Sequence, residues 1–318
     1  MSDATQKTIV SIGECMVELA SAGEGLYRRG FAGDTLNTAW YLRREMDPAW
    51  RVAYLTALGT DETSEEMLGF FGAAGIATDM VRRIPDRMPG LYMIHLAGAE
   101  RSFSYWRDSA AARLLAADPG HLARAFAAGD AFYFSGITLA ILTAPDRQRL
   151  LDQLAAAKAA GKAVAFDPNI RPRLWPDPAE MREAITQGAA VATICLPSFP
   201  DEAAAFGDHS PDATADRYLA SGVGEIVVKD GAAPAVVATA SGRERIAAMP
   251  VADAVDTTGA GDSFNAGYLA ARLAGVPAPE AVRRGHALAG EVVRHYGALI
   301  REHGVRPASH GEEVFPSV

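Results

Sequence analysis

The sequence predicts an α/β protein with a mainly parallel central sheet, helices on both faces of that sheet, and a small additional β-sheet. Two observations predict the central sheet: apolar runs of strand length recur along the chain, and segments with helical periodicity separate them. A third observation predicts the small sheet. Residues 90–106 alternate in polarity around a Gly-Ala-Glu-Arg turn, which is typical of a β-hairpin.

The central sheet is expected to contain six strands in parallel pairing. Their continuous apolar character is typical of strands that are buried on both faces. In chain order the predicted strands are 8–17, 51–59, 130–136, 162–169, 190–197 and 224–231. Between the third and the fourth, residues 146–161 are rich in Ala, Leu and Arg and end on Gly161, as a helix with a glycine C-cap does.

The small sheet is expected to combine residues 17–33 with the hairpin at 90–107. The first of these segments is rich in glycine and poor in helix-forming residues. The chain contains no linker, internal repeat or low-complexity tract, which favours a single domain of residues 1–318 with a β lid over two separate domains. The tail from about Arg301 carries Pro, Gly and charges and is expected to be loose.

Composition and charge exclude several classes of protein. Apolar residues make up 49% of the chain and charged residues 22%, which excludes a disordered or disulfide-knit protein. The net charge of −9 argues against a nucleic-acid-binding protein. No apolar stretch reaches the ~18 residues that a membrane helix needs, and the N-terminus lacks the features of a secretory signal. Cys15 and Cys195 lie far apart in apolar runs, so we expect reduced thiols in a soluble, cytoplasmic protein.

The strongest chemical signal lies in residues 253–275, DAVDTTGAGDSFNAGYLAARLAG. Gly259, Ala260 and Gly261 precede a helix that is expected from about residue 262 to 274. Glycines at a helix entrance let backbone N–H groups face an anion. Asp262 in the first turn is either an ordinary N-terminal stabiliser or a base that takes a proton from an attacking hydroxyl, as an Asp does in kinases.

Two other phosphate-binding loops do not match this segment. A Walker loop, G-x-x-x-x-G-K-[ST], occurs nowhere in the chain. The dinucleotide fingerprint also fails, because its third glycine would come late, at Gly267, and no buried apolar strand precedes the loop. A nicotinamide-dependent enzyme is therefore disfavoured.

The residues from Asp256 to Asp262 match the DTTGAGD motif of the ribokinase-like (PfkB-type) carbohydrate kinases, and the chain resembles that family over most of its length. FAGDTLNTAWYLRR at 31–44 is similar to the family's N-terminal Gly-Gly-Asp/Asn motif, with Ala32 in place of the first glycine. FDPNIRPRLW at 166–175 and VVKDG at 227–231 also fit. The resemblance implies an α/β core with a β lid, and phosphoryl transfer from ATP, with Mg²⁺, to a sugar-type hydroxyl. A requirement for a monovalent cation stays open.

Within the family, residues 100–115 (ERSFSYWRDSAAARLL) are similar to the 2-keto-3-deoxygluconate kinases. The resemblance implies a substrate that carries a carboxylate and is phosphorylated on its terminal hydroxyl. Arginine suits such a substrate because a guanidinium binds a carboxylate as a fork, whereas a neutral sugar gives no reason for an arginine. Arg107 and Arg171 are the candidates. The alternatives are a surface salt bridge beside Asp108 for Arg107, and a helix-capping or phosphate-contacting role for Arg171.

A second group of residues is expected to bind the sugar hydroxyls. Asp34 and Asn37 lie three positions apart at a predicted helix start, so both can face one ligand, and Gly33 before them favours its close approach. Tyr105 shares a strand face with Arg107, and Tyr92 on the partner strand is a further candidate. Helix capping for the first pair, and packing within the lid for the tyrosines, are the alternatives.

The nucleotide side of the site is predicted from fewer signals. The chain has only four lysines, and Lys229 ends a buried strand, which favours contact with a nucleotide. The resemblance also places Asn169 and Gly231 near ATP. The family's Asn-x-x-Glu motif is not kept here, which leaves Asp201 and Glu202 as candidates for ordering Mg²⁺ through water. The alternative is that both are solvated acids at a helix start.

The predicted function is an ATP-dependent kinase that phosphorylates 2-keto-3-deoxygluconate on its 6-hydroxyl. Its partners are then a sugar acid and ATP, with no nucleic acid and no membrane, and an apolar outer face of the lid would suit a homo-oligomer. Fructokinase, ribokinase or nucleoside kinase activity on the same fold stays open, as does a sugar-sensing protein without catalysis. His295 and Tyr296, near the end of the last long helix, have no role that the pattern decides.

Overall fold

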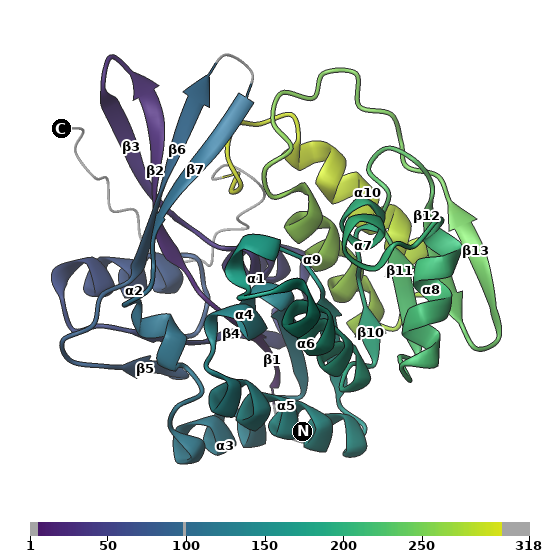
Figure 1. Cartoon of the computed structure of the whole chain (residues 1–318), viewed down its shortest axis with the longest axis horizontal. Coiled ribbons are helices and arrows are strands. Elements are labelled where there is room, and N and C mark those ends of the chain that lie inside the picture. Colours follow the sequence, from purple (N-terminus) through teal and green to yellow (C-terminus); the bar gives the residue numbers. More distant parts are fainter. Residues whose placement is uncertain (1–5, 98–99, 301–318) are drawn as a thin grey trace.

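The central sheet of the computed structural model, which describes residues 6–97 and 100–300, contains nine strands (Figure 1). From one edge to the other they are β13 (Gly242–Ile246), β12 (Ala235–Thr239), β11 (Glu225–Val228), β10 (Ile194–Cys195), β9 (Ala163–Asp167), β8 (Ala131–Ser135), β1 (Lys7–Ile12), β4 (Trp50–Leu58) and β5 (Val81–Arg83). The strands from β11 to β5 pair in parallel, whereas β12 and β13 are antiparallel additions at one edge. The mainly parallel sheet predicted from the sequence is therefore confirmed.

Helices cover both faces of this sheet, and a separate apolar core fills each side. Successive residues of a strand face opposite sides, so Ile9 of β1 packs into one core and Val10 into the other. One face carries α1 (Asp34–Glu45), α2 (Glu62–Ala73), α9 (Ala260–Leu273) and α10 (Ala278–Val292). The other carries α3 (Pro119–Ala128), α4 (Gly136–Ile141), α5 (Ala144–Ala159), α6 (Pro178–Ala190), α7 (Phe199–Phe206) and α8 (Pro211–Ala220).

A separate four-stranded sheet projects from the helices and the central sheet, at the top left of Figure 1. Its spatial order is β3 (Leu26–Ala32), β2 (Met16–Gly23), β6 (Gly90–Ala97) and β7 (Glu100–Trp106). The central pair, β2 and β6, is parallel, and each outer pair is an antiparallel hairpin. The predicted small sheet is thus confirmed. The centre of the hairpin turn and the tail from Arg301 lie outside the described residues.

The first predicted strand, 8–17, is in fact two strands in two sheets. β1 ends at Ile12 and β2 begins at Met16, so the chain leaves the central sheet and enters the small one between them. Gly13 at this junction lies against α1: a Cβ there would come within 2.3 Å of the Thr35 hydroxyl. An apolar pattern carries no mark of such a crossing, because the residues on both sides of it are buried.

The prediction for residues 190–197 was too long, and three short strands were not predicted. Helix α6 continues to Ala190, and β10 contains only Ile194 and Cys195. β13 and β5 are the two edge strands of the central sheet, and β12 lies beside β13. All three are short, and β13 is rich in charged residues. Among the described residues, no helix has both the length and the apolar character needed to span a bilayer.

Candidate active site

The glycine-rich turn before α9 is held in a conformation that only glycine adopts easily. Gly259 has a φ of 76°, in the left-handed region, and a Cβ there would lie 2.8 Å from the carbonyl oxygen of Ala298. Asp256 braces the turn by accepting hydrogen bonds from the backbone N–H of Thr258 (2.9 Å) and of Gly297 (2.8 Å). These contacts hold the glycine turn in place, and α9 starts directly after it at Ala260, close to the predicted start at about residue 262.

Asp262 lies in the first turn of α9 and faces α1. Its carboxylate accepts a hydrogen bond of 2.8 Å from the side-chain amide of Asn37, and its carbonyl oxygen accepts one of 3.2 Å from the Thr38 hydroxyl. Burial, together with the nearby charge of Asp34, raises the pKa of Asp262 from its ordinary value of 3.8 to about 7. A carboxylate with this pKa can take up a proton near neutral pH, as a general base must.

Asp34 begins α1 and lies on the same side of that helix as Asn37. The Asn169 side chain donates a hydrogen bond of 2.8 Å to the Asp34 carboxylate, and burial raises the pKa of Asp34. Asn169 itself has a φ of 34°, which is unusual for a residue with a side chain. The structure thus places Asn169 against Asp34. Its expected contact with ATP stays a prediction.

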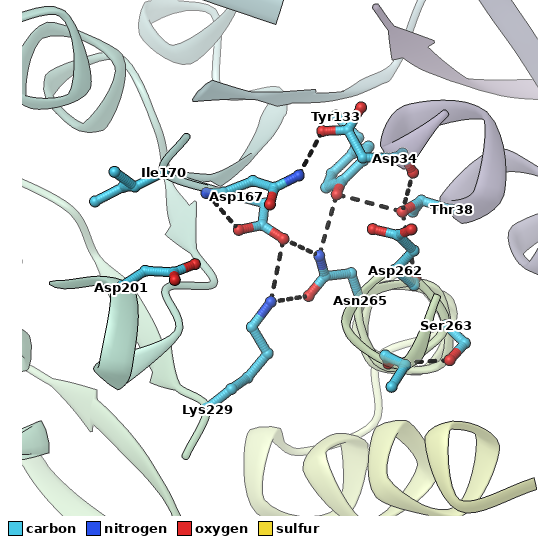
Figure 2. Close-up of polar contacts among 12 residues, drawn as sticks. Asp34, Thr38, Tyr133, Asp167, Ile170, Asp201, Lys229, Asp262, Ser263 and Asn265 are labelled. Atoms are coloured by element: carbon cyan, nitrogen blue, oxygen red, sulfur yellow. Dashed lines mark hydrogen bonds and ion pairs between the residues drawn. The ribbon is translucent and has the colours of Figure 1, made fainter. Parts of the chain in front are cut away.

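Beside these acids lies a buried polar network that joins β8, β9, α9 and Lys229, the residue after β11 (Figure 2). The Lys229 ammonium donates to Asp167 (3.1 Å) and to the side-chain oxygen of Asn265 (3.0 Å). Asn265 donates in turn to Asp167 (2.6 Å) and to the Tyr133 hydroxyl (3.1 Å). Because each of these buried groups is hydrogen-bonded, the network is expected to hold Lys229 rigidly beside the N-terminal end of α9.

Sequence reasoning did not identify Asn265, Asp167 or Tyr133. Asn265 was recognisable in principle, because it lies three residues after Asp262 and so shares a helix face with it. A Cβ placed on Gly261 would lie 3.8 Å from the Lys229 ammonium, so this charge is close to the exposed glycine turn. Gly231, two residues beyond Lys229, is exposed and has a φ of 57°.

A pocket opens between the start of α1, the small sheet and the segment after β9. It brings together five of the residues predicted to bind substrate, together with an arginine and an acid that were not predicted. The lining residues are Glu14, Met16, Gly33, Asp34, Tyr105, Arg107, Ile137, Arg171, Arg173 and Leu174. Gly33 lets the chain pass close to Glu14, because a Cβ there would lie 2.2 Å from the Glu14 carbonyl oxygen.

Arg107 is 9% exposed and forms an ion pair with Glu14, which is 3% exposed. Burial raises the pKa of Glu14, and the positive charge of Arg107 partly offsets that rise. Among the described residues, neither the second carboxylate oxygen of Glu14 nor the Nε of Arg107 has a hydrogen-bond partner. The surface salt bridge with Asp108, considered from the sequence, is thus replaced by a buried pair with Glu14.

Arg171, from the segment after β9, and Tyr105, from β7, line the same pocket. Arg171 donates to Asp201 at 3.2 Å and to the carbonyl oxygen of Ile170 at 2.7 Å. The ring of Tyr105 lies 5.9 Å from that of Tyr92, whose hydroxyl donates to Glu18. The two tyrosines therefore pack together on one face of the small sheet.

The two acids proposed for Mg²⁺ differ in their surroundings. Both oxygens of Glu202, which is fully buried, are bonded: one to Arg217 (2.6 Å) and the other to the Tyr218 hydroxyl (2.9 Å). Burial raises its pKa to about 7. Asp201 is partly exposed and has one oxygen in its pair with Arg171. Within the described part of the chain, no group of three or more His, Cys, Asp or Glu side chains is placed to hold a metal ion.

His295 and Tyr296 lie just beyond α10. The His295 ring is 3.2 Å from Glu291, and Tyr296 is 80% exposed. Neither is among the residues that line the pocket described above.

Comparison with known proteins identifies the family to which these features correspond. The family model described as "pfkB family carbohydrate kinase" matches residues 6–302. A 2-dehydro-3-deoxygluconokinase from Dickeya dadantii (strain 3937) is 43% identical over 304 residues, covering 93% of this chain and 97% of that protein.

Solved structures show the same fold. The crystal structure of a PfkB protein from Polaromonas sp. JS666 has a TM-score of 0.79 and 29% identity, over 91% of this chain and 96% of that one. A putative ribokinase II from E. coli, in complex with ATP and Mg²⁺, has a TM-score of 0.79 and 23% identity, over 92% and 94% of the two chains. At that identity, the second structure supports the fold alone.

Proposed function

The chain belongs to the pfkB family of carbohydrate kinases, and we propose that it transfers the γ-phosphoryl group of ATP to the terminal hydroxyl of 2-dehydro-3-deoxygluconate, also called 2-keto-3-deoxygluconate. One observation carries the proposal. Asp262, with a pKa of about 7, is held by Asn37 at the glycine entrance of α9 and lies near Asp34, which lines an arginine-containing pocket. This arrangement provides a base, a phosphate-binding helix end and a carboxylate-binding pocket together.

In the proposed reaction, Asp262 accepts the proton of the substrate's terminal hydroxyl. The hydroxyl oxygen forms a bond to the γ-phosphorus of ATP, and the bond from that phosphorus to the bridging oxygen breaks, which releases ADP. The backbone N–H groups of Gly259, Ala260 and Gly261, with the dipole of α9, stabilise negative charge on the transferred group. Lys229, held beside this turn by Asp167 and Asn265, adds a hydrogen-bond donor whose charge Asp167 partly compensates.

The acceptor is bound by the residues around the pocket. Asp34 and Asn37 suit its hydroxyls, because one accepts hydrogen bonds and the other both donates and accepts them. Arg107 and Arg171 suit its carboxylate. The small sheet, which contributes Tyr105 and ends next to Arg107, would act as a lid that excludes water as a competing acceptor.

Mg²⁺ would neutralise charge on the phosphates of ATP. This ion typically takes only one or two carboxylates from a protein and completes its shell with phosphate and water. Of the two predicted acids, Asp201 fits, because its ion pair with Arg171 engages one carboxylate oxygen. Glu202 does not fit, because both its oxygens are bonded inside the protein.

Three further expectations belong to this proposal and stay predictions. A homo-oligomer could form through the small sheet, where Leu26 and Trp106 are 65% and 57% exposed. A cytoplasmic location and a monovalent-cation requirement are likewise untested. Fructose or ribose as the acceptor is less well supported, since neither offers a carboxylate to the pocket arginines.

ADP release with a panel of acceptors tests the proposal. The panel contains 2-dehydro-3-deoxygluconate, its galactonate epimer, fructose and ribose, and 2-dehydro-3-deoxygluconate should give a higher kcat/KM than fructose or ribose, with the choice between the two epimers left open. Asp262→Asn should lower kcat by about a thousandfold, since a positioned base contributes about 10²–10⁴. A higher kcat/KM for fructose or ribose would overturn the substrate, and near wild-type turnover by the variant would overturn the base.

The pH dependence gives a second test of Asp262. Below pH 7 the carboxyl is protonated and cannot accept a proton, so kcat/KM should rise with pH and level off above about 7. The contribution of Asp262 to the stability of the fold should have the opposite pH dependence. Between pH 4 and 7 the native state holds a proton that the unfolded chain has lost, so this group's contribution falls as pH rises. Asp262→Asn should therefore melt no lower than wild type at pH 8, which serves as the folding control.

A further inference from the structure

The two arginines assigned to the substrate carboxylate already have carboxylate partners in the protein. Arg107 pairs with the buried Glu14, and Arg171 pairs with Asp201. Each pair brings one positive and one negative charge to the region of the pocket. An incoming anion therefore meets two nearly neutral pairs, which can form hydrogen bonds but supply little net positive charge.

Arg173 lines the same pocket and differs in this respect. Among the described residues, no carboxylate lies within ion-pair distance of its guanidinium. It stands on the 3-10 turn Pro172–Leu174 that follows β9, and its side chain is at the exposed mouth of the pocket. Arg173 is not among the residues predicted for the site, and the proposed function gives it no role.

Contacts with the small sheet fix where this guanidinium lies. Its centre is 4.9 Å from the Tyr105 ring and 6.0 Å from the Phe103 ring, and one of its nitrogens donates to the Tyr105 hydroxyl at 3.3 Å. A guanidinium has five N–H donors, and stacking on an aromatic face leaves those at its edge free to bind. The stack thus leaves the edge donors accessible at the pocket mouth, with a charge that no carboxylate in the described part of the chain compensates.

We propose that Arg173 is a specificity-determining residue that supplies the net positive charge for the carboxylate of the acceptor, whereas Arg107 and Arg171 supply oriented hydrogen bonds. The proposal rests on the sugar-acid kinase function argued above. It predicts that the preference for an anionic acceptor depends on Arg173 as well as on the two arginines that pair with carboxylates. It also predicts that the preference weakens with salt, because an exposed charge is screened.

The test compares the KM values for the sugar acid and for ATP in wild type, Arg173→Gln and Arg173→Lys. Arg124→Gln is the matched control: Arg124 is exposed on α3 and does not line the pocket, and its substitution removes one positive charge, as Arg173→Gln does. Arg173→Gln should raise the KM for the sugar acid about tenfold, the effect expected of one charge-assisted hydrogen bond. Arg173→Lys, which keeps the charge but not the planar stack, should raise it about threefold.

The KM for ATP should stay within about twofold of wild type in every variant, and Arg124→Gln should match wild type for both substrates. Raising the salt concentration from about 0.02 to 0.3 M should increase the sugar-acid KM of wild type more than that of Arg173→Gln. Equal KM values for Arg173→Gln and Arg124→Gln would overturn the role of Arg173 while wild type still turns over the acid. Failure of wild type to phosphorylate the acid would instead overturn the proposed function, and this inference with it.

Discussion

Two buried glutamate–arginine pairs occupy different regions of this molecule, and their hydrogen bonds differ. Glu14 and Arg107 meet where the small sheet joins the pocket, and Glu202 and Arg217 meet between α7 and α8. In both pairs burial raises the pKa of the glutamate and the arginine opposes the rise. Both glutamates are buried, although Arg217 is 25% exposed and Arg107 only 9%.

The difference lies in how completely each pair is bonded. Glu202 is bonded through both oxygens, and Arg217 also binds Asp208 at 2.7 Å. Around Glu14 and Arg107, one carboxylate oxygen and the Nε remain without partners among the described residues. A buried polar atom without a partner is costly, so such an atom beside a pocket indicates a place for a ligand. The satisfied pair serves the fold, and the unsatisfied pair is suited to binding.

The largest expected effect is at the satisfied pair. Arg217→Met would leave the buried Glu202 and the partly buried Asp208 without their cation. Removing one partner of a buried pair typically costs about 3–5 kcal/mol, so we expect a loss of about 3 kcal/mol in the free energy of unfolding. Urea denaturation measures this loss. The kcat of the folded fraction should stay within about twofold of wild type, and a kcat loss above tenfold would contradict the structural role.

A smaller effect on stability, with a larger one on binding, is expected for Arg107→Met. Removing Arg107 leaves one carboxylate, Glu14, without its cation, whereas removing Arg217 leaves two, and Glu14 lies beside a pocket. We expect a stability loss of about 1–2 kcal/mol and a KM for the sugar acid that rises about 30-fold, with the KM for ATP unchanged. Adding Glu14→Met should restore stability and leave the KM high. Recovery of both quantities, or a rise confined to the KM for ATP, would place Arg107 outside the acceptor site.

The smallest effect is expected for Glu14→Gln. The side-chain amide keeps its shape and can still accept a hydrogen bond from Arg107, while the negative charge beside the substrate carboxylate is removed. Stability should change by less than about 1 kcal/mol, and the KM for the sugar acid should fall about threefold. Steady-state kinetics and thermal melting measure both. If the KM rises tenfold instead, the charge of Glu14 is needed to orient Arg107, and the two pairs are more alike than their hydrogen bonds indicate.

Much of the site could be predicted because its parts are local in the sequence. The turn from Asp256 to Asp262 contains its own bracing acid, its left-handed glycine and its helix start, so seven consecutive residues specify it. Asp34 and Asn37 are likewise three residues apart on one helix. The parallel sheet was predictable for a related reason, since a strand buried on both faces must be continuously apolar.

Other parts could not be predicted, because their meaning depends on which groups meet in space. Glu14 lies 93 residues from Arg107, and nothing in either segment indicates the other. Asp201 and Glu202 are adjacent in the sequence, yet one faces Arg171 near the pocket and the other is enclosed with Tyr218. The strand predicted at 8–17 failed for the same reason, because its two halves are equally apolar and belong to different sheets.

The sequence by itself determined the α/β architecture, the small sheet, the glycine turn with Asp262, and the presence of arginines suited to an acid. These depend on periodicity and on short contiguous motifs. The tertiary structure alone decided the state of each charge: Asp262 with a raised pKa beside Asp34, Arg107 paired with Glu14, and Arg173 without a carboxylate partner among the described residues. The physical reason is that pKa values and ion pairs depend on burial and on distances of a few ångströms between distant segments, which no local pattern encodes.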